Sequence, residues 1–148
     1  MESFQGSFRY NAGASDDVDQ AINRAIAPLN TLVRQVARPR LRSVTRPAER
    51  IAIASTSDAL RIVWDPCAPI VVTGNGASVD WKGEDGQSIK VGAEFANDRL
   101  SLVFRAQDGQ RSDLYSLSPS GDALTVNVTV ASDRLPKPLI YKLVYRRV

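Results

Sequence analysis

A hydrophobic period of two residues, which begins near residue 50 and continues to the end of the chain, constrains the fold more than any other feature. Alternating apolar and polar positions are typical of a strand with one buried face. The apolar ladders are Ile51/Ile53, Leu60/Ile62/Trp64, Ile70/Val72, Val79/Trp81, Ile89/Val91/Ala93/Phe95, Leu100/Leu102/Phe104, Leu124/Val126/Val128/Val130 and Leu139/Tyr141/Leu143/Tyr145. Turn signals such as Asn75-Gly76 and Asp108-Gly109 separate them, and the stretch 112–118 is a weaker strand candidate.

Residues 3–11 alternate in the same way, with Phe4, Gly6, Phe8 and Tyr10 on one side, and predict a first strand. Short, regularly spaced strands joined by turns favour an antiparallel architecture. We therefore expect one mainly β domain over residues 1–148. It is an up-and-down meander or barrel of about eight to ten strands, because closure removes exposed sheet edges.

A helical insert is predicted between the first two strands, over about residues 15–38. Ser15 is a suitable N-cap, and the acidic residues after it suit the first turn of a helix. An apolar stripe at helical spacing follows: Val18, Ile22, Ala25, Ile26, Leu29, Val33 and Val36. We expect a kink, or two short helices meeting, at Pro28, and an end to the helical region at Pro39. This insert is either a lid or a plug for the barrel.

Positive charge is concentrated just after this stripe, although the net charge is only +3. The arginines between residues 34 and 50 are Arg34, Arg38, Arg40, Arg42, Arg46 and Arg50. Three interpretations are open: a solvated linker, a site for nucleic-acid phosphates, or a contact with anionic lipid headgroups or a protein partner through Arg34, Arg38, Arg40 and Arg42. Nucleic acid is disfavoured because aromatic residues are not interleaved with the arginines. No apolar run approaches the roughly 20 residues of a membrane helix.

Residue types that carry catalysis are scarce. The chain has no histidine, which removes the commonest general base and metal ligand, and it has one cysteine, Cys67. A nucleophile elbow and a phosphate-binding loop are also missing, and Gly74-Asn75-Gly76 is interpreted as a hairpin turn. We therefore expect no enzyme activity, no catalytic residues, no metal site and no cofactor, and an inert or half-buried thiol at Cys67.

The stretch Phe4-Gln5-Gly6-Ser7-Phe8, followed by Asn11 and Ser15, resembles the opening Gly-x-Trp-x-x-Asn-x-x-x-Ser of small exported bacterial lipocalin-like domains. Phe8 stands in place of the tryptophan. The Asp108-Gly109 turn, the stretch 115–124 and the final Tyr145-Arg146 are also similar. The resemblance implies a barrel whose first strand packs Phe8 against a late arginine, Arg146 or Arg147, at the closed end.

The helical insert departs from the lipocalin plan and is closer to intracellular fatty-acid-binding proteins, in which two short helices cover the barrel mouth. In those proteins arginine and tyrosine side chains hold a carboxylate. Arg105 and Tyr141 are the candidates here by residue type alone.

The expected function is that of a non-enzymatic, lipocalin-like protein that binds a small hydrophobic or amphipathic molecule. The candidate lining is Trp64, Trp81, Phe95, Phe104, Arg105 and Tyr141. The same aromatics are alternatively plain core residues packed against the helical stripe. In that case the chain is a structural or interaction module with a filled core. Met1 is not followed by a basic and then an apolar segment, so we expect a periplasmic or secreted protein written without its signal, or otherwise a cytoplasmic one.

Overall fold

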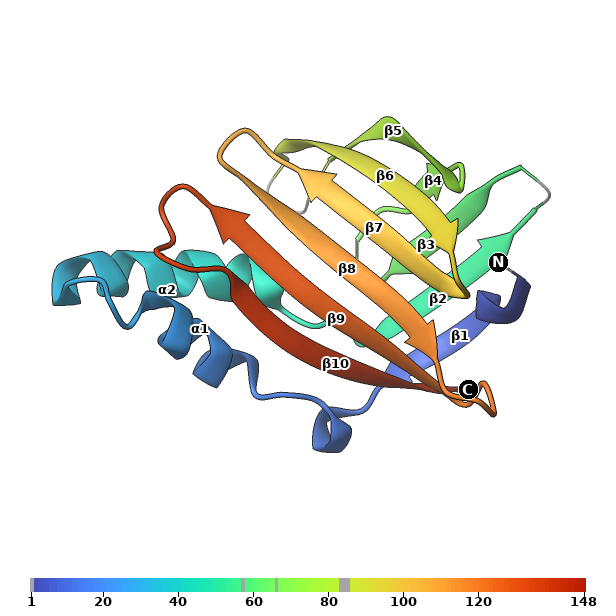
Figure 1. The fold of residues 1–148 in the computed structure, drawn as a ribbon, viewed down its shortest axis with the longest axis horizontal. Coiled ribbons are helices and arrows are strands. Elements are labelled where there is room, and N and C mark those ends of the chain that lie inside the picture. Colours follow the sequence, from blue (N-terminus) through green and yellow to red (C-terminus); the bar gives the residue numbers. More distant parts are fainter. Residues whose placement is uncertain (1, 57, 66, 83–85) are drawn as a thin grey trace.

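Ten antiparallel strands and two helices make up the computed structural model, which describes residues 2–56, 58–65, 67–82 and 86–148 (Figure 1). The strands are β1 Gly6–Tyr10, β2 Arg50–Ser55, β3 Leu60–Trp64, β4 Ile70–Val72, β5 Asn75–Lys82, β6 Ser88–Ala96, β7 Arg99–Arg105, β8 Gly109–Leu117, β9 Ala123–Ser132 and β10 Leu139–Arg147. The helices, α1 Val18–Ile26 and α2 Thr31–Thr45, both lie between β1 and β2. Short 3-10 turns cover Glu2–Phe4 and Ala12–Ala14.

The strands form one sheet in the order β4-β3-β2-β1-β10-β9-β8-β7-β6-β5. The first and last strands of this order approach each other, so the sheet curls into a nearly closed barrel. Trp81 Nε1, on β5, donates to the carbonyl of Ala68, just before β4, at 3.1 Å, which links the two sides of the gap. The predicted antiparallel barrel with helices after its first strand is confirmed.

The two ends of the barrel differ, and Figure 1 separates them. Both termini and the β8–β9 turn lie at one end, which we call the closed end. Both helices, the β7–β8 turn and the β9–β10 connection lie at the other, which we call the helix end. Helix α1 packs against β10 and contributes four buried residues to the common core, Ala21, Ile22, Ala25 and Ile26.

The helical insert begins and ends later than predicted. Asp17, not Ser15, caps α1 by accepting from the Gln20 amide at 3.3 Å. The chain breaks near Pro28 into two helices, which was one of the two expected outcomes. The end predicted at Pro39 is wrong, because α2 continues through it to Thr45. The last turn beyond Pro39 is anchored in the fold, because Thr45 is buried and the Val44 carbonyl accepts from Arg111 at 3.0 Å.

Ser15 and Asp16 have a different role, which is to pair with β10 beyond the end of β1. The Val144 amide donates to Ser15 Oγ at 2.8 Å, and the Lys142 amide donates to Asp16 Oδ2 at 2.8 Å. The Asn11 amide donates to the Val144 carbonyl at 2.9 Å. These bonds satisfy backbone groups of β10 that β1 does not reach, which places α1 against the barrel.

Candidate ligand-binding site

Arg147 organises the closed end. Its guanidinium lies 4.7 Å from the centroid of the Phe8 ring, and the two residues are cross-strand partners. It also donates to the carbonyls of Gly121 at 2.8 Å, Gln5 at 2.7 Å and Ser3 at 3.0 Å. The expected pairing of Phe8 with a late arginine is confirmed, and the partner is Arg147, while Arg146 is exposed on the strand. One cation therefore joins the N-terminal turn, the β8–β9 turn and the first strand.

Three large rings gather at the helix end. Trp64, Trp81 and Phe104 lie near the ends of β3, β5 and β7, and their ring centroids are 5.7 to 6.3 Å apart. All three are half-buried, whereas Phe4 and Phe8 at the closed end are fully buried. The Trp64 indole donates to the Tyr115 hydroxyl at 2.9 Å. The aromatic group is thus accessible to solvent in part, as the wall of a site would be.

A buried ion pair stands beside these rings. Arg111 Nε and Nη2 donate to the two carboxylate oxygens of Asp113, at 2.7 and 3.1 Å. The Asp113 side chain is 2% exposed and that of Arg111 is 27% exposed. Arg111 Nη1 also donates to the Val44 carbonyl at 3.0 Å, in the last turn of α2. Burial opposes the charge on Arg111, but Asp113 outweighs burial and raises the pKa of the guanidinium.

Tyr141 adds a polar group without a hydrogen-bond partner among the described residues. Its side chain is buried, at 2% exposure, and its hydroxyl is unpaired there. Asp113 pairs with Val128 and Val128 pairs with Tyr141, so the carboxylate and the phenol share one inward-facing row across β8, β9 and β10. Burial raises the pKa of Tyr141 to about 12, although Arg111 opposes the rise, so the hydroxyl keeps its proton at neutral pH.

The residues predicted to line a site are separated by the structure. Trp64, Trp81 and Phe104 lie together, and Tyr141 faces the same end of the interior. Phe95 instead packs edge-on against Phe4, with centroids 6.0 Å apart, at a different place. Their role in binding stays a prediction.

The predicted placement of Arg105 is corrected. It alternates with the inward residues Leu102 and Phe104 and is exposed on the outer face. Sequence reasoning missed Arg111 because the strand was expected to start only at residue 112, and it missed Asp113 because 112–118 was considered a weak strand without a defined inward face. A period-two pattern running from Gly109 through Arg111, Asp113 and Tyr115 was the signal that identifies them.

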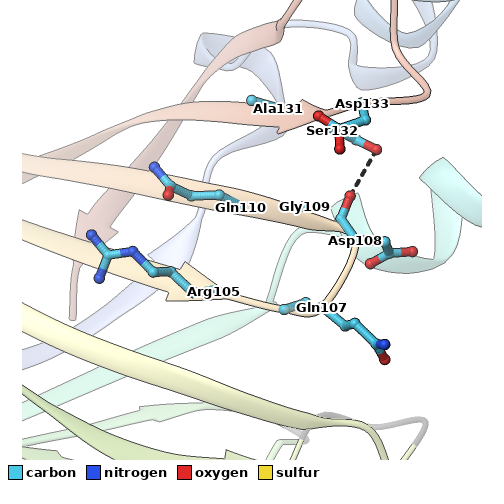
Figure 2. Close-up of a pocket in the computed structure, with 9 residues that line it drawn as sticks. Arg105, Gln107, Asp108, Gly109, Gln110, Ala131, Ser132 and Asp133 are labelled. Carbon is cyan, nitrogen blue, oxygen red and sulfur yellow. Dashed lines mark hydrogen bonds between the residues drawn. The ribbon is translucent and has the colours of Figure 1, made fainter.

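Arg105 instead borders a shallow depression of about 380 Å³ at the β7–β8 turn. Figure 2 shows its side chains pointing in different directions around the turn, with Ser132 Oγ donating to the Asp108 carbonyl at 3.0 Å. The walls are turn backbone, polar side chains and two small alanines, Ala106 and Ala131, from 105–110 and 131–133. These lining residues include none of the large apolar side chains that a hydrophobic ligand needs.

The arginines predicted to contact a partner all lie on α2. Arg34, Arg38 and Arg42 bond within the helical region, to Thr31 at 3.2 Å, Asn23 at 3.1 Å and Asp19 at 2.9 Å respectively. Arg40 is exposed. Within the described ranges, no helix is long and apolar enough to cross a bilayer, and no cluster of three potential metal ligands is present. Cys67 is half-buried.

Solved structures with this fold span essentially the whole chain. A structure titled "REP1-NXSQ fatty acid transporter" has a TM-score of 0.65 at 12% identity, covering 100% of this chain and 98% of its own. Lipid binding protein 8 of Caenorhabditis elegans has a TM-score of 0.63 at 14% identity, with coverage of 100% and 97%. A secretory abundant heat soluble protein of Ramazzottius varieornatus has a TM-score of 0.67 at 13% identity, with coverage of 99% and 96%. These similarities show the fold alone. No protein-family model and no curated protein sequence matches the chain.

Proposed function

We propose that this protein is a non-enzymatic barrel that binds a small hydrophobic or amphipathic molecule at its helix end. The observation that carries the proposal is the combination of partly exposed aromatic rings and buried polar side chains at that end. Trp64, Trp81 and Phe104 are half-buried there, and the Arg111 guanidinium lies 6.0 Å from the centroid of the Phe104 ring. The buried Tyr141 hydroxyl, on the same inward row as Asp113, has no partner within the described residues. Sites for such ligands combine apolar walls with a few fixed polar groups. The titles of similar folds include a fatty acid transporter and a lipid-binding protein, which supports the same class of ligand.

The test uses the chain's own fluorescence, because Trp64 and Trp81 are its two tryptophans. Laurate, lauryl alcohol and lauramide share one alkyl chain and differ in their heads, so they sample ligand classes. Binding of at least one of them should change tryptophan emission and raise the melting temperature, since a ligand that binds only the folded state stabilises it. A panel without any shift in emission or melting temperature contradicts the proposal.

Two phenylalanines provide a matched pair of variants for this titration. Phe104 touches both tryptophans, whereas Phe95 packs on Phe4 away from them. Phe104→Ala should weaken binding by about ten-fold, since a ring in contact with a ligand contributes on the order of 1–2 kcal/mol. Phe95→Ala should leave the affinity unchanged. Equal losses in the two variants would mean that the binding surface is not at the helix end.

A second candidate function rests on the outward face of α2, and it is contact with an anionic membrane surface. Leu32 is 75% exposed, and it shares this face with the exposed residues Val33, Val36, Arg40 and Val44. An amphipathic helix that exposes both apolar and cationic groups suits an anionic lipid interface. The adjoining flank, with Ala37 and Leu41, is partly buried against the core.

Co-sedimentation with vesicles tests this second function. The chain should pellet with phosphatidylglycerol vesicles and stay in solution with phosphatidylcholine ones. Arg40→Glu combined with Leu32→Ser should abolish pelleting, and Arg61→Glu, at an exposed position of β3, is the control that should not. Retention in solution with both vesicle types points away from a membrane role and leaves a protein partner for the helix.

We extend the proposal to a bacterial origin and to a location outside the cytoplasm. It rests on the Gly6-x-Phe8 opening and its pairing with Arg147. Fractionation of the source cells, with an antibody to the chain, tests it: recovery with the cytoplasmic fraction would exclude export.

A further inference from the structure

The fork between Arg111 and Asp113 determines the charge that the barrel interior offers to a ligand. Both carboxylate oxygens accept from the guanidinium, at 2.7 and 3.1 Å, so the two charges compensate within one pair. The third bond of Arg111, to the Val44 carbonyl, uses a further N–H on the partly negative C-terminal end of α2. Arg111 is therefore already paired, and it is not a free cation that would attract a ligand carboxylate.

A ligand carboxylate would meet an unfavourable field there. To reach Arg111 it must approach the Asp113 carboxylate, which is 2% exposed and is therefore hardly screened by water. Two like charges in such a place repel, and displacing Asp113 from its fork would leave a buried charge without a partner. An acid head is disfavoured on both routes.

The Tyr141 hydroxyl, in contrast, suits an uncharged polar head. It is buried, has no partner among the described residues and shares an inward row with Asp113. A phenol both donates and accepts, so it matches a hydroxyl or amide head that does the same. The two other fully buried tyrosines each have a hydrogen-bond partner, since the Tyr115 hydroxyl accepts from Trp64 and the Tyr145 hydroxyl donates to the Ala48 carbonyl.

We propose that the barrel selects amphipathic molecules with an uncharged polar head, of the long-chain alcohol or amide class, over carboxylates of the same chain, with Tyr141 binding the head and Asp113 excluding the acid. This inference rests on the proposed function, because it specifies the ligand class of the same site. Asp113 acts through Arg111 and through repulsion, so it is a specificity-determining residue.

Titration of the wild-type chain at neutral pH with laurate and lauryl alcohol tests the inference directly. The alcohol should bind at least about ten-fold more tightly, in line with the penalty for a poorly compensated buried charge. Equal binding, or tighter binding of laurate, overturns the inference and leaves the proposed function standing. Failure of both probes and of lauramide overturns the proposed function itself, and the inference with it.

Two variants assign the preference to residues. Asp113→Asn removes the compensating charge and should reverse the order, so that laurate binds more tightly than the alcohol. Tyr141→Phe keeps the ring and should weaken alcohol binding by about five- to ten-fold while leaving laurate nearly unchanged. Tyr145→Phe, which loses a hydroxyl bonded elsewhere, is the matched control that should not alter the ratio.

Asp113→Asn also leaves Arg111 without its ion partner, so its fold must be checked by circular dichroism. Where that variant unfolds, Arg111→Gln combined with Asp113→Asn supplies a neutral pair that hydrogen bonds can satisfy. This double variant should lose most of the discrimination against laurate, because the carboxylate that repels the acid is gone and no free cation replaces it, while Tyr141 can still bind the alcohol. An undiminished wild-type preference for the alcohol in the double variant would overturn the assignment to Asp113.

Discussion

The two ends of the barrel are built from the same kinds of residue but satisfy them differently. At the closed end, Arg147 bonds three backbone carbonyls and stacks on Phe8, which is fully buried. At the helix end, Arg111 bonds a carboxylate and a helix carbonyl beside half-buried rings, and Tyr141 has a hydroxyl unpaired within the described residues. Bonds within the protein such as those of Arg147 stabilise the fold. Partly exposed rings and a hydroxyl unpaired among the described residues, as at the helix end, can still contact and hydrogen-bond a ligand.

Truncating one phenylalanine at each end gives the largest expected contrast. Phe8→Ala should lower the free energy of unfolding by about 4 kcal/mol, because Phe8 is fully buried and is covered by Arg147. Phe104→Ala, at a half-buried ring, should lower it by about 2 kcal/mol. Urea unfolding measures both. Losses of equal size would remove the distinction between a packed end and an open one.

Two neighbouring arginines of β10, Arg146 and Arg147, should differ in how much they stabilise the closed end. Arg147→Ala removes the three carbonyl bonds and the contact with Phe8, and it should lower stability by about 3 kcal/mol. Arg146→Ala, at an exposed position, should change it by less than about 0.5 kcal/mol. Thermal and urea unfolding of the two variants make the comparison. A large loss of stability in Arg146→Ala would mean that Arg147 is not the arginine that holds Phe8 and the closed end together.

Alkaline pH probes the helix end through Tyr141. Burial raises its pKa from 10.0 to about 12, so above pH 10 the unfolded chain releases a proton that the folded chain retains. Its contribution to stability is full below pH 10 and should fall by about 2–3 kcal/mol as the pH rises to about 12. Tyr115 and Tyr145, whose pKa values burial also raises, should shift the curve the same way. Unfolding curves of wild type and Tyr141→Phe measure the difference, and identical pH dependence in the two would contradict the prediction.

The smallest expected changes in stability have opposite signs, and they concern two tyrosines of β10. Tyr141→Phe removes a buried hydroxyl that is unpaired in the described structure, and it should raise the stability of the ligand-free protein by about 1 kcal/mol. Tyr145→Phe breaks the 2.8 Å bond to the Ala48 carbonyl and should lower stability by about 1 kcal/mol. Differential scanning calorimetry resolves both. A loss at Tyr141 would mean that its hydroxyl is already satisfied.

The alternation of strand residues predicted much of the fold, because a two-residue period states which face of a strand is buried. The ladders from Ile51 to Tyr145 correspond to strands, and the motif around Phe8 anticipated the contact with Arg147. The helical insert was predicted in kind and in place, but its limits were not. Ser15 was expected to cap a helix, yet it accepts from Val144, because only the folded sheet brings the unpaired edge of β10 to it.

The sequence by itself determined the antiparallel barrel, the helices after the first strand and the candidate aromatic residues. The tertiary structure showed which arginine near the β7–β8 turn meets other polar side chains, although alternation along each strand already carried a signal for its direction. Arg105 and Arg111 lie on paired strands at either side of one turn, but Arg105 points out and Arg111 points in. The tertiary structure also decided that Arg111 pairs with Asp113, and that Tyr141 lies on the same inward row as Asp113, two strands away from it. The register between strands sets these relations, and register depends on long-range pairing that local sequence does not encode.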